Sequence, residues 1–322
     1  MRAGRRSAPA TQVSLPLARK PPDDKPAPLS RYALRMSTFE FSQALVADIA
    51  AADVARALAE DVGSGDLTAG LIGADRRAQA RVLARDSAMI CGAPWAEAAW
   101  RQLDPDVQIH WLVPEGARSR ANQVVLEVEG LARALLTAER TALNFLQLQS
   151  AVATKTAAFV DAVKGTRARI VDTRKTLPGL RMAQKYAVQV GGGVNHRIGL
   201  FDAVLIKENH IAAAGGVTAA LQAAAQVAQS AAFIEIEVET LAQLEEALQA
   251  GAKMVLLDNM DMATLHEAVD LNQGRAMLEI SGGVNLDTVR ALAETGVDRI
   301  SVGALTKDVD ATDFSLRLQD VQ

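Results

Sequence analysis

Residues 233–259, FIEIEVETLAQLEEALQAGAKMVLLDN, predict a strand, a helix and a second strand in immediate succession. Residues 233–239 and 253–259 are short segments rich in Ile, Val and Leu. Between them, TLAQLEEALQ has the apolar spacing of an amphipathic helix, and Gly251 suits a helix C-cap. Two strands joined by such a helix pair in parallel through a right-handed crossover. The stretch therefore predicts one repeat of a parallel α/β fold.

The same alternation extends to both sides of this repeat. Segments typical of strands occur at 169–173, 203–209, 276–283 and 299–305, and helical segments separate most of them. About six such units, with no GxGxxG after the first strand, favour an α/β barrel over a doubly wound sheet. We expect this barrel domain to cover residues 146–322, with a C-terminal segment able to pack back on the preceding domain.

Residues 36–145 predict a small α+β domain in front of the barrel. A helix is expected at 37–61, because Ser37 and Glu40 have the spacing of a capping box. The other expected elements are strand segments at 81–90, 107–113 and 124–128, the helix APWAEAAWRQL, and a long helix at about 131–164.

Residues 1–35 differ from the rest of the chain in composition. They hold eight Lys and Arg against two Asp, and most of the ten prolines. We interpret them as a disordered leader, or as a start codon assigned too far upstream of Met36.

Composition excludes several classes of protein. The 322 residues contain no run of 18 uninterrupted apolar residues, so no membrane span is expected. The single cysteine, Cys91, rules out an intrachain disulfide and disfavours a cysteine-based zinc site. Few aromatic residues and a formal charge of −4 disfavour a nucleic-acid surface. A cytoplasmic protein is the expectation.

Polar residues occur at the end of each expected barrel strand. They are Asp172 and Arg174, Lys207 and Asn209, Glu237 and Glu239, Asp258 and Asn259, Ser281 to Gly283, and Gly303. Barrel enzymes carry their chemistry on the loops at the carboxyl ends of the strands. Six successive polar strand ends therefore indicate an enzyme.

Positive charge is concentrated between Glu139 and Lys207, where eleven Lys and Arg face four Asp and Glu. The densest part is DTRKTLPGLR at 172–181, followed by NHRI at 195–198. Arg forms forked bonds with carboxylates and phosphates, and Lys acts as a point charge. This segregation predicts a site for a small ligand with several negative charges.

Two carboxylates and two glycine-containing segments complete the expected site. Glu237 and Asp258, at neighbouring strand ends, suit Mg²⁺, which takes one or two carboxylates together with substrate phosphate oxygens. Residues 281–283 (SGG) and 302–304 (VGA) end the last two strands, where barrels commonly bind phosphate through backbone N–H groups.

These segments resemble the quinolinate phosphoribosyltransferase family from about residue 40 to the C-terminus. The motifs that carry the resemblance are DTRKTLPGLRMAQKYAVQVGGGVNHRIGL, LIKENH, EIEVE, LLDNM, EISGGV and ISVGAL, in this order. The family implies a ferredoxin-like N-terminal domain and an incomplete α/β barrel of the type II phosphoribosyltransferase kind. It also implies a homodimer in which one subunit caps its partner's site. Assembly of such dimers into higher oligomers is compatible with the resemblance.

The implied reaction joins quinolinate to phosphoribosyl pyrophosphate with Mg²⁺, and gives nicotinate mononucleotide, pyrophosphate and CO₂ for NAD biosynthesis. By resemblance, Lys175, Glu237 and Asp258 are catalytic, and the two acids face the metal. The resemblance assigns substrate binding to these residues and to a further set: Arg140 (across the dimer), Thr173, Arg174, His196, Arg197, Lys207, Ser281, Gly282, Gly283, Val302, Gly303 and Ala304.

Several alternatives stay open at this point. A related protein of the molybdenum-transport type, or a non-catalytic sensor of an anionic metabolite, would share many of these features. Arg181 and Lys185, four residues apart on an expected helix, suit a solvated stripe about as well as ligand contact. Glu235 and Glu239 suit structural pairing with the cations or a place in the site.

Overall fold

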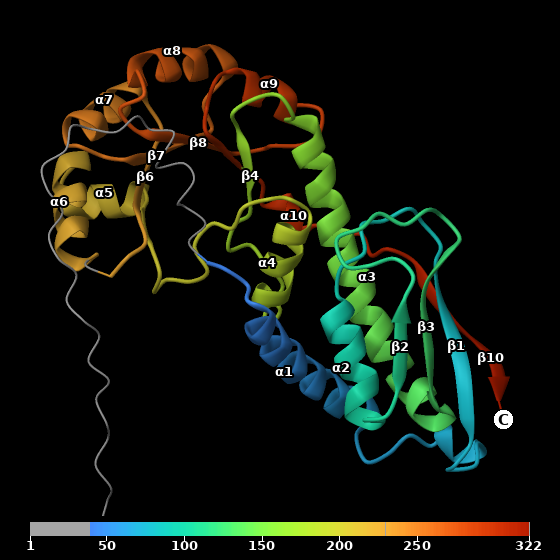
Figure 1. Ribbon diagram of the computed structural model, residues 1–322. Coiled ribbons are helices and arrows are strands. Elements are labelled where there is room, and N and C mark those ends of the chain that lie inside the picture. The colour runs from blue at the N-terminus through green and yellow to red at the C-terminus, as the bar shows by residue number, and fades with distance from the viewer. Residues whose placement is uncertain (1–38, 229, 322) are drawn as a thin grey trace, which may run out of the picture. The chain divides into compact units, whose positions relative to one another are not determined.

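The structure is a computed structural model that describes residues 39–228 and 230–321 (Figure 1). The expected leader, 1–35, and the expected cap Ser37 lie outside the described residues. All described residues belong to one unit of the chain, Ser37–Gln322.

The first half of the chain forms helices on one face of an antiparallel sheet (Figure 1). Its elements are α1 (Gln43–Val62), the 3₁₀ helix η2 (Ala69–Leu71), β1 (Arg77–Ala84), α2 (Ala93–Leu103), β2 (Gln108–Trp111), β3 (Gln123–Leu131) and α3 (Ala132–Ala162). The sheet order is β10-β1-β3-β2, and its outer strand β10 (Phe314–Val321) comes from the C-terminus. With α2 and α3 as crossovers, this is a ferredoxin-like βαββαβ arrangement.

Side-chain alternation explains how this sheet makes a core. Along β1, alternate residues are buried, among them Ala80 and Val82, because successive side chains of a strand point to opposite faces. The buried face packs against α2 and α3, where Trp95, Trp100 and Leu135 are completely buried. The helix expected from residue 37 begins only at Gln43, where the Ser42 hydroxyl caps the backbone N–H of Leu45.

The second half forms the parallel sheet expected from residues 233–259. Its elements are β4 (Arg169–Val171), α4 (Arg181–Val190), β5 (Val204–Ile206), α5 (Glu208–Ala214), α6 (Val217–Val227), β6 (Ile234–Val238), α7 (Leu241–Gln249), β7 (Met254–Asp258), α8 (Met262–Asn272), β8 (Met277–Ser281), α9 (Val289–Glu294), β9 (Arg299–Ser301) and α10 (Ala304–Lys307). The order is β4-β9-β8-β7-β6-β5, and every pair is parallel.

The barrel is incomplete among the described strands, because the edge strands β4 and β5 do not pair with each other. Segment 194–198 follows α4 in the chain and lies beside β4, where a single parallel bridge joins Val171 to Val194. Gly251 and Gly296 have φ angles of 85° and 94° directly after the caps of α7 and α9, as expected of helix ends. The expectation of an α/β fold with an incomplete barrel is thus confirmed.

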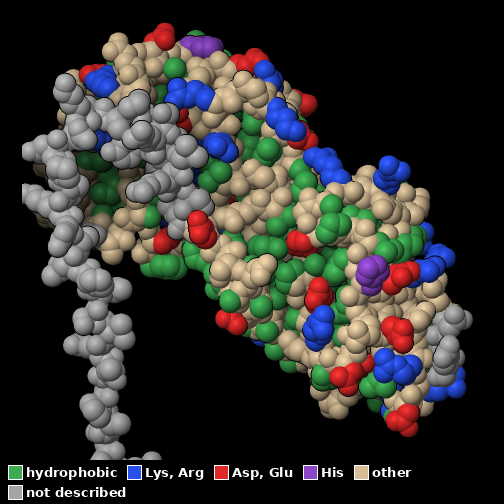
Figure 2. All heavy atoms as spheres, viewed as in Figure 1, with side chains coloured by type: hydrophobic (Ala, Val, Ile, Leu, Met, Phe, Trp, Pro, Cys, Tyr) green, Lys and Arg blue, Asp and Glu red, His purple; other side chains and the backbone are tan. Residues whose placement is uncertain are grey.

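Helix α3 connects the two halves and packs against α4 (Figure 1). Among the described residues, no helix combines the length and apolar character needed to cross a membrane. On the face drawn in Figure 2, the described Lys and Arg side chains are interspersed with Asp and Glu. The surplus of cations between residues 139 and 207 therefore does not form a uniformly basic surface on that face.

Candidate active site

A cavity of about 570 Å³ opens at the carboxyl ends of the parallel strands. Eight of the residues expected in the site line it: Thr173, Arg174, Lys175, His196, Arg197, Lys207, Glu237 and Ser281. They come from the segments after β4 and β5, from segment 194–198, and from β6 and β8. The parallel topology brings these positions together, because all the strands end at the same edge of the sheet.

The other seven expected residues do not line this cavity. Arg140 is exposed on α3 and does not line this cavity. Asp258 ends β7 and accepts a hydrogen bond of 3.0 Å from the amide of Asn259. Neither Gly282 and Gly283 nor residues 302–304 line the cavity, although a Cβ placed on Gly303 would be 3.1 Å from Lys175 Cδ. Gly303 therefore allows the side chain of Lys175 to lie against the backbone.

Arg174, Lys175 and Arg197 form what we call the basic wall of the cavity. Hydrogen bonds between backbone and side-chain groups hold it in place. The N–H of Lys175 bonds to Thr173 Oγ1 at 3.1 Å, and the Lys175 carbonyl accepts a bond from Thr306 Oγ1 at 2.7 Å. Arg197 is 9% exposed and donates through Nη1 to the Ala203 carbonyl at 3.2 Å. Burial, together with the nearby charge of Arg174, lowers the pKa of Arg197 from its usual value. Two neighbouring cations of this kind favour an anion between them.

Two buried carboxylates, Glu235 and Glu279, hold His196 in place. Its Nε2 lies 2.7 Å from Glu235 Oε2 and 3.7 Å from Glu279 Oε1. Its Nδ1 accepts the backbone N–H of Arg197 at 2.8 Å, so the ring with its hydrogen on Nε2 satisfies both contacts. Glu279 in turn accepts bonds from Arg299 Nε at 2.6 Å and from the hydroxyl of Ser301.

The acidic side of the cavity is formed by Glu237 on β6. It is 8% exposed, and its Oε2 accepts a bond of 2.9 Å from Lys207 Nζ. Glu235 points to the same side of the strand and serves His196, whereas Glu239 follows the strand and is exposed. The three Glu residues of this segment therefore have three different surroundings.

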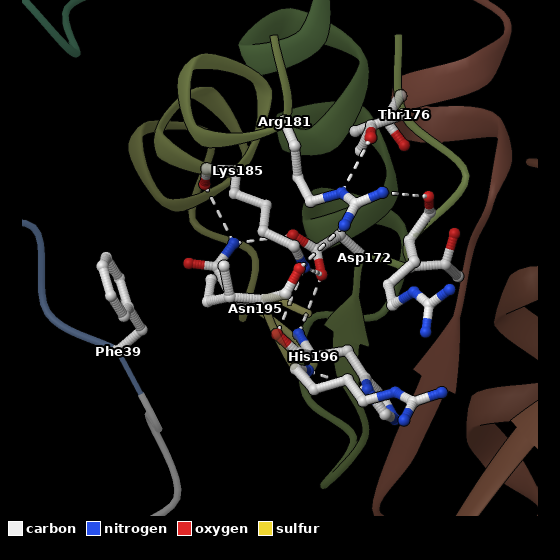
Figure 3. Close-up of polar contacts among 12 residues, drawn as sticks. Phe39, Asp172, Thr176, Arg181, Lys185, Asn195 and His196 are labelled. Atoms are coloured by element: carbon white, nitrogen blue, oxygen red, sulfur yellow. Dashed lines mark hydrogen bonds and ion pairs between the residues drawn. The ribbon is translucent and has the colours of Figure 1, made fainter. Parts of the chain in front are cut away.

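Arg181 and Lys185 have neither of the roles considered for them from the sequence. Lys185 is completely buried, so it is not part of a solvated stripe, and neither residue lines the cavity. Figure 3 shows both side chains pointing toward the segments that carry Thr176 and His196. Their bonds to those segments correct the expectation.

The comparisons with known proteins agree with this geometry. A sequence model described as the C-terminal domain of quinolinate phosphoribosyl transferase matches residues 152–317, and one for its N-terminal domain matches residues 66–150. The chain belongs to the quinolinate phosphoribosyltransferase family. The resemblance inferred from the motifs is thereby confirmed.

Relatives in this family are similar over most of the chain. A probable nicotinate-nucleotide pyrophosphorylase (carboxylating) from Bacillus subtilis is 40% identical over 257 residues, covering 80% of this chain and 89% of its own. The enzyme of that name from Mycobacterium leprae is 49% identical over 214 residues, covering 66% of this chain and 75% of its own. The solved nicotinate-nucleotide pyrophosphorylase from Francisella tularensis gives a TM-score of 0.82 at 44% identity, covering 85% of this chain and 97% of its own. These relatives support neither the molybdenum-transport alternative nor the sensor.

Eight cavity residues of this family member were not expected from the sequence: Leu200, Ala203, Val204, Leu205, His210, Leu256, Glu279 and Ser301. Glu279 lies inside EISGG, two positions before the Ser281 that the sequence singled out. His210 ends KENH, and its Nδ1 accepts the backbone N–H of Lys207 at 2.9 Å. Both residues belong to motifs that carried the resemblance, so looking along those motifs for inward-facing positions would have found them.

Proposed function

We propose that this cavity binds quinolinate through its basic wall and holds phosphoribosyl pyrophosphate beside it. As a member of its family, the chain is a quinolinate phosphoribosyltransferase (decarboxylating), a pentosyltransferase of de novo NAD biosynthesis. The observation that carries the placement is the meeting of Arg174, His196 and Arg197 in one cavity.

Quinolinate carries two carboxylates on adjacent ring carbons, and the basic wall offers cations from two segments. Arg174 and Arg197 would each bind a carboxylate, since guanidinium groups form charge-assisted bonds with such anions. Burial and the charge of Arg174 together lower the pKa of Arg197 in the free protein, and binding of an anion would relieve the repulsion between the two side chains. Thr173, His196 and Lys207 line the same space and would complete the contacts.

The phosphoribosyl donor would lie toward the ends of β8 and β9. Gly282 and Gly283 have φ angles of 108° and 59°, a backbone conformation that suits successive N–H groups turned toward an anion. Val302, Gly303 and Ala304 follow β9, and Lys175 reaches this segment. A phosphate there would be bound by backbone N–H groups. The ammonium of Lys175, which also lines the cavity, would contact both this phosphate and quinolinate.

In the proposed mechanism the protein mainly aligns the substrates and balances charge. The ring nitrogen of quinolinate attacks C1 of the ribose as pyrophosphate leaves, and positive charge develops on the sugar. Glu237 on β6 and Asp258 at the end of the neighbouring strand β7 would stabilise that charge. Alignment of the two substrates contributes about 7–11 kcal/mol where it is good. The adjacent carboxylate then leaves as CO₂, because the pyridinium ring stabilises the electron pair that stays behind.

The acidic residues also fit Mg²⁺, which neutralises the leaving pyrophosphate when bound. Glu237 and Asp258 offer hard oxygen donors on the neighbouring strands β6 and β7, and Mg²⁺ takes few protein carboxylates when phosphate is present. His196, Glu235 and Glu279 also form a compact group. That group is less suited to a cation, because Glu279 already bonds Arg299.

A homodimer with a shared site is part of the proposal. Arg140 is exposed on α3 and lies outside the cavity of its own chain, so it is available to a second copy. Leu200 and Phe201, which follow segment 194–198 in the chain, are 76% and 80% exposed, which suits burial by a partner. Mixing an Arg140→Ala variant with a Lys175→Ala variant tests this, because a shared site predicts that mixed dimers recover activity. Mixtures that stay inactive despite subunit exchange would contradict it.

The placement is tested by measuring CO₂ release from carboxyl-labelled quinolinate as a function of phosphoribosyl pyrophosphate and Mg²⁺. We expect release that requires all three components. A crystal soaked with quinolinate should show the diacid beside Lys175 and Arg197, and any other location would overturn the assignment.

We also infer a cytoplasmic location, supported by the single, buried cysteine, and cell fractionation tests it.

A further inference from the structure

Arg181 and Lys185 lie one helical turn apart on α4, behind the basic wall of the cavity. In front of them run two segments, 172–176 and 195–198, which we call the basic segments. These carry the cations proposed to bind quinolinate. Figure 3 shows Arg181 and Lys185 reaching toward them from the same helix.

Lys185 joins the two basic segments through a buried ion pair. Its Nζ lies 2.5 Å from Asp172 Oδ1 and donates to the His196 carbonyl at 3.2 Å. Asp172 also accepts the backbone N–H of His196 at 2.8 Å and the amide of Asn195 at 2.7 Å. Both charged side chains are fully buried. The pair therefore holds one end of each segment at a defined position.

Arg181 joins the same segments at their other ends. Its Nη1 donates to the Ile198 carbonyl at 3.2 Å, and its Nη2 to the Arg174 carbonyl at 3.5 Å. Its Nε bonds the Thr176 hydroxyl at 3.1 Å. The planar guanidinium group thus spans both segments, and Arg174 is itself one of the proposed quinolinate ligands.

We propose that Arg181 and Lys185 are positioning residues that hold the two basic segments in register, so that the cations of both meet the two carboxylates of one ligand. The spacing of adjacent carboxylates is fixed by the pyridine ring, and a small slip between the segments would separate the cations from it. This inference rests on the proposed quinolinate site. It gives α4 a role in recognising a diacid, although α4 contributes no side chain to the cavity.

A merely structural role makes a different prediction. If α4 only stabilised the fold, its variants would lower the melting temperature and the amount of active protein, and the remaining enzyme would keep its KM values. A positioning role instead raises the KM for quinolinate selectively. It leaves the KM for phosphoribosyl pyrophosphate close to that of the wild type.

The test uses full-length Arg181→Ala, Arg181→Lys and Arg275→Ala in steady-state kinetics. Arg275 is a matched control, because its guanidinium also donates to two backbone carbonyls, of Leu271 and Asn272, away from the cavity. Because misplaced substrate contacts cost up to about 100-fold, we expect the quinolinate KM to rise about 10-fold in Arg181→Ala. Arg181→Lys should be intermediate, and Arg275→Ala should match the wild type.

A second arm removes the buried pair without leaving an unpaired charge. The double variant Asp172→Asn with Lys185→Met should also raise the quinolinate KM. In calorimetry, it should weaken the binding of quinolinate more than the binding of the monocarboxylate nicotinate. Unchanged quinolinate KM in both Arg181→Ala and the double variant would overturn the inference. Equal loss in Arg275→Ala would do so as well. Failure of the proposed function is distinguishable, because the wild type would then release no CO₂ from quinolinate.

Discussion

Two groups of charged side chains, which we call the inner and the outer layer, lie at the cavity. They differ in whether their ion-pair partners belong to the chain. The inner layer pairs within the chain: Asp172 with Lys185, Glu235 with His196, and Glu279 with Arg299. The outer layer consists of Arg174, Lys175 and Arg197, which line the cavity and form no ion pair with any residue between 39 and 321 that the structure describes. The comparison shows that residue type does not decide the role of a charge. Lys185 and Arg299, whose partners lie inside the chain, hold neighbouring residues in place, whereas Arg174, Lys175 and Arg197 have no such partner and are among the residues proposed to bind the ligand.

The largest expected effect concerns the inner layer and stability. Lys185→Met should lower the free energy of unfolding by about 3–5 kcal/mol, because it leaves Asp172 buried without its cation. Denaturant unfolding followed by circular dichroism measures the loss. The added Asp172→Asn change should recover most of it, since the remaining side chains are then neutral. If Lys185→Met alone were as stable as the wild type, the Asp172–Lys185 pair would be accessible to water and the expectation would be wrong.

The next largest effect concerns the outer layer, where substitutions should weaken quinolinate binding and leave the stability of the fold unchanged. Arg197→Ala should raise the quinolinate KM about 10- to 100-fold, because one charge-assisted bond is worth about 1.5–3 kcal/mol. Thermal unfolding of the same variant should match the wild type. Lys175→Ala provides the companion measurement. If both variants kept an unaltered quinolinate KM, the two layers would not differ in the way described.

Glu237 lies at the boundary between the layers, because it bonds Lys207 and also lines the cavity. Glu237→Gln should lower kcat about 10-fold with little change in the quinolinate KM, since the carboxylate would act on charge that develops during the reaction. Glu239→Gln is the control, because Glu239 is exposed beyond the end of β6. A fall in kcat of similar size in the control would remove the distinction between the two residues.

The smallest expected effect comes from Glu115, a partly buried carboxylate that accepts hydrogen bonds from two backbone N–H groups. Burial raises its pKa above the ordinary 4.5, against bonds from Gly92 and Ala93 N–H and from Tyr186. A raised folded-state pKa favours the protonated, folded form, so this contribution to stability is complete below pH 4.5. It is lost as pH rises through the folded pKa. Unfolding free energies measured across this range should decline less in Glu115→Gln, and a parallel decline would contradict the assignment.

The sequence predicted the architecture well because apolar periodicity and helix caps are local signals. Residues 233–259 alone showed the strand-helix-strand repeat, and the polar strand ends indicated the edge where the cavity lies. The roles of Arg181 and Lys185 could not be predicted, because they depend on carbonyls of Arg174, His196 and Ile198 that only the folded chain brings close. Spacing on a helix shows which side chains share a face, but not whether that face is covered.

The strand β10 has a consequence for the order in which the molecule can be built. It pairs with β1 across more than two hundred intervening residues, and Phe314 adds its ring to the core of the first half. During synthesis, the N-terminal end emerges from the ribosome long before this strand exists. The edge of β1 must therefore stay unpaired until residues 314–321 have been released.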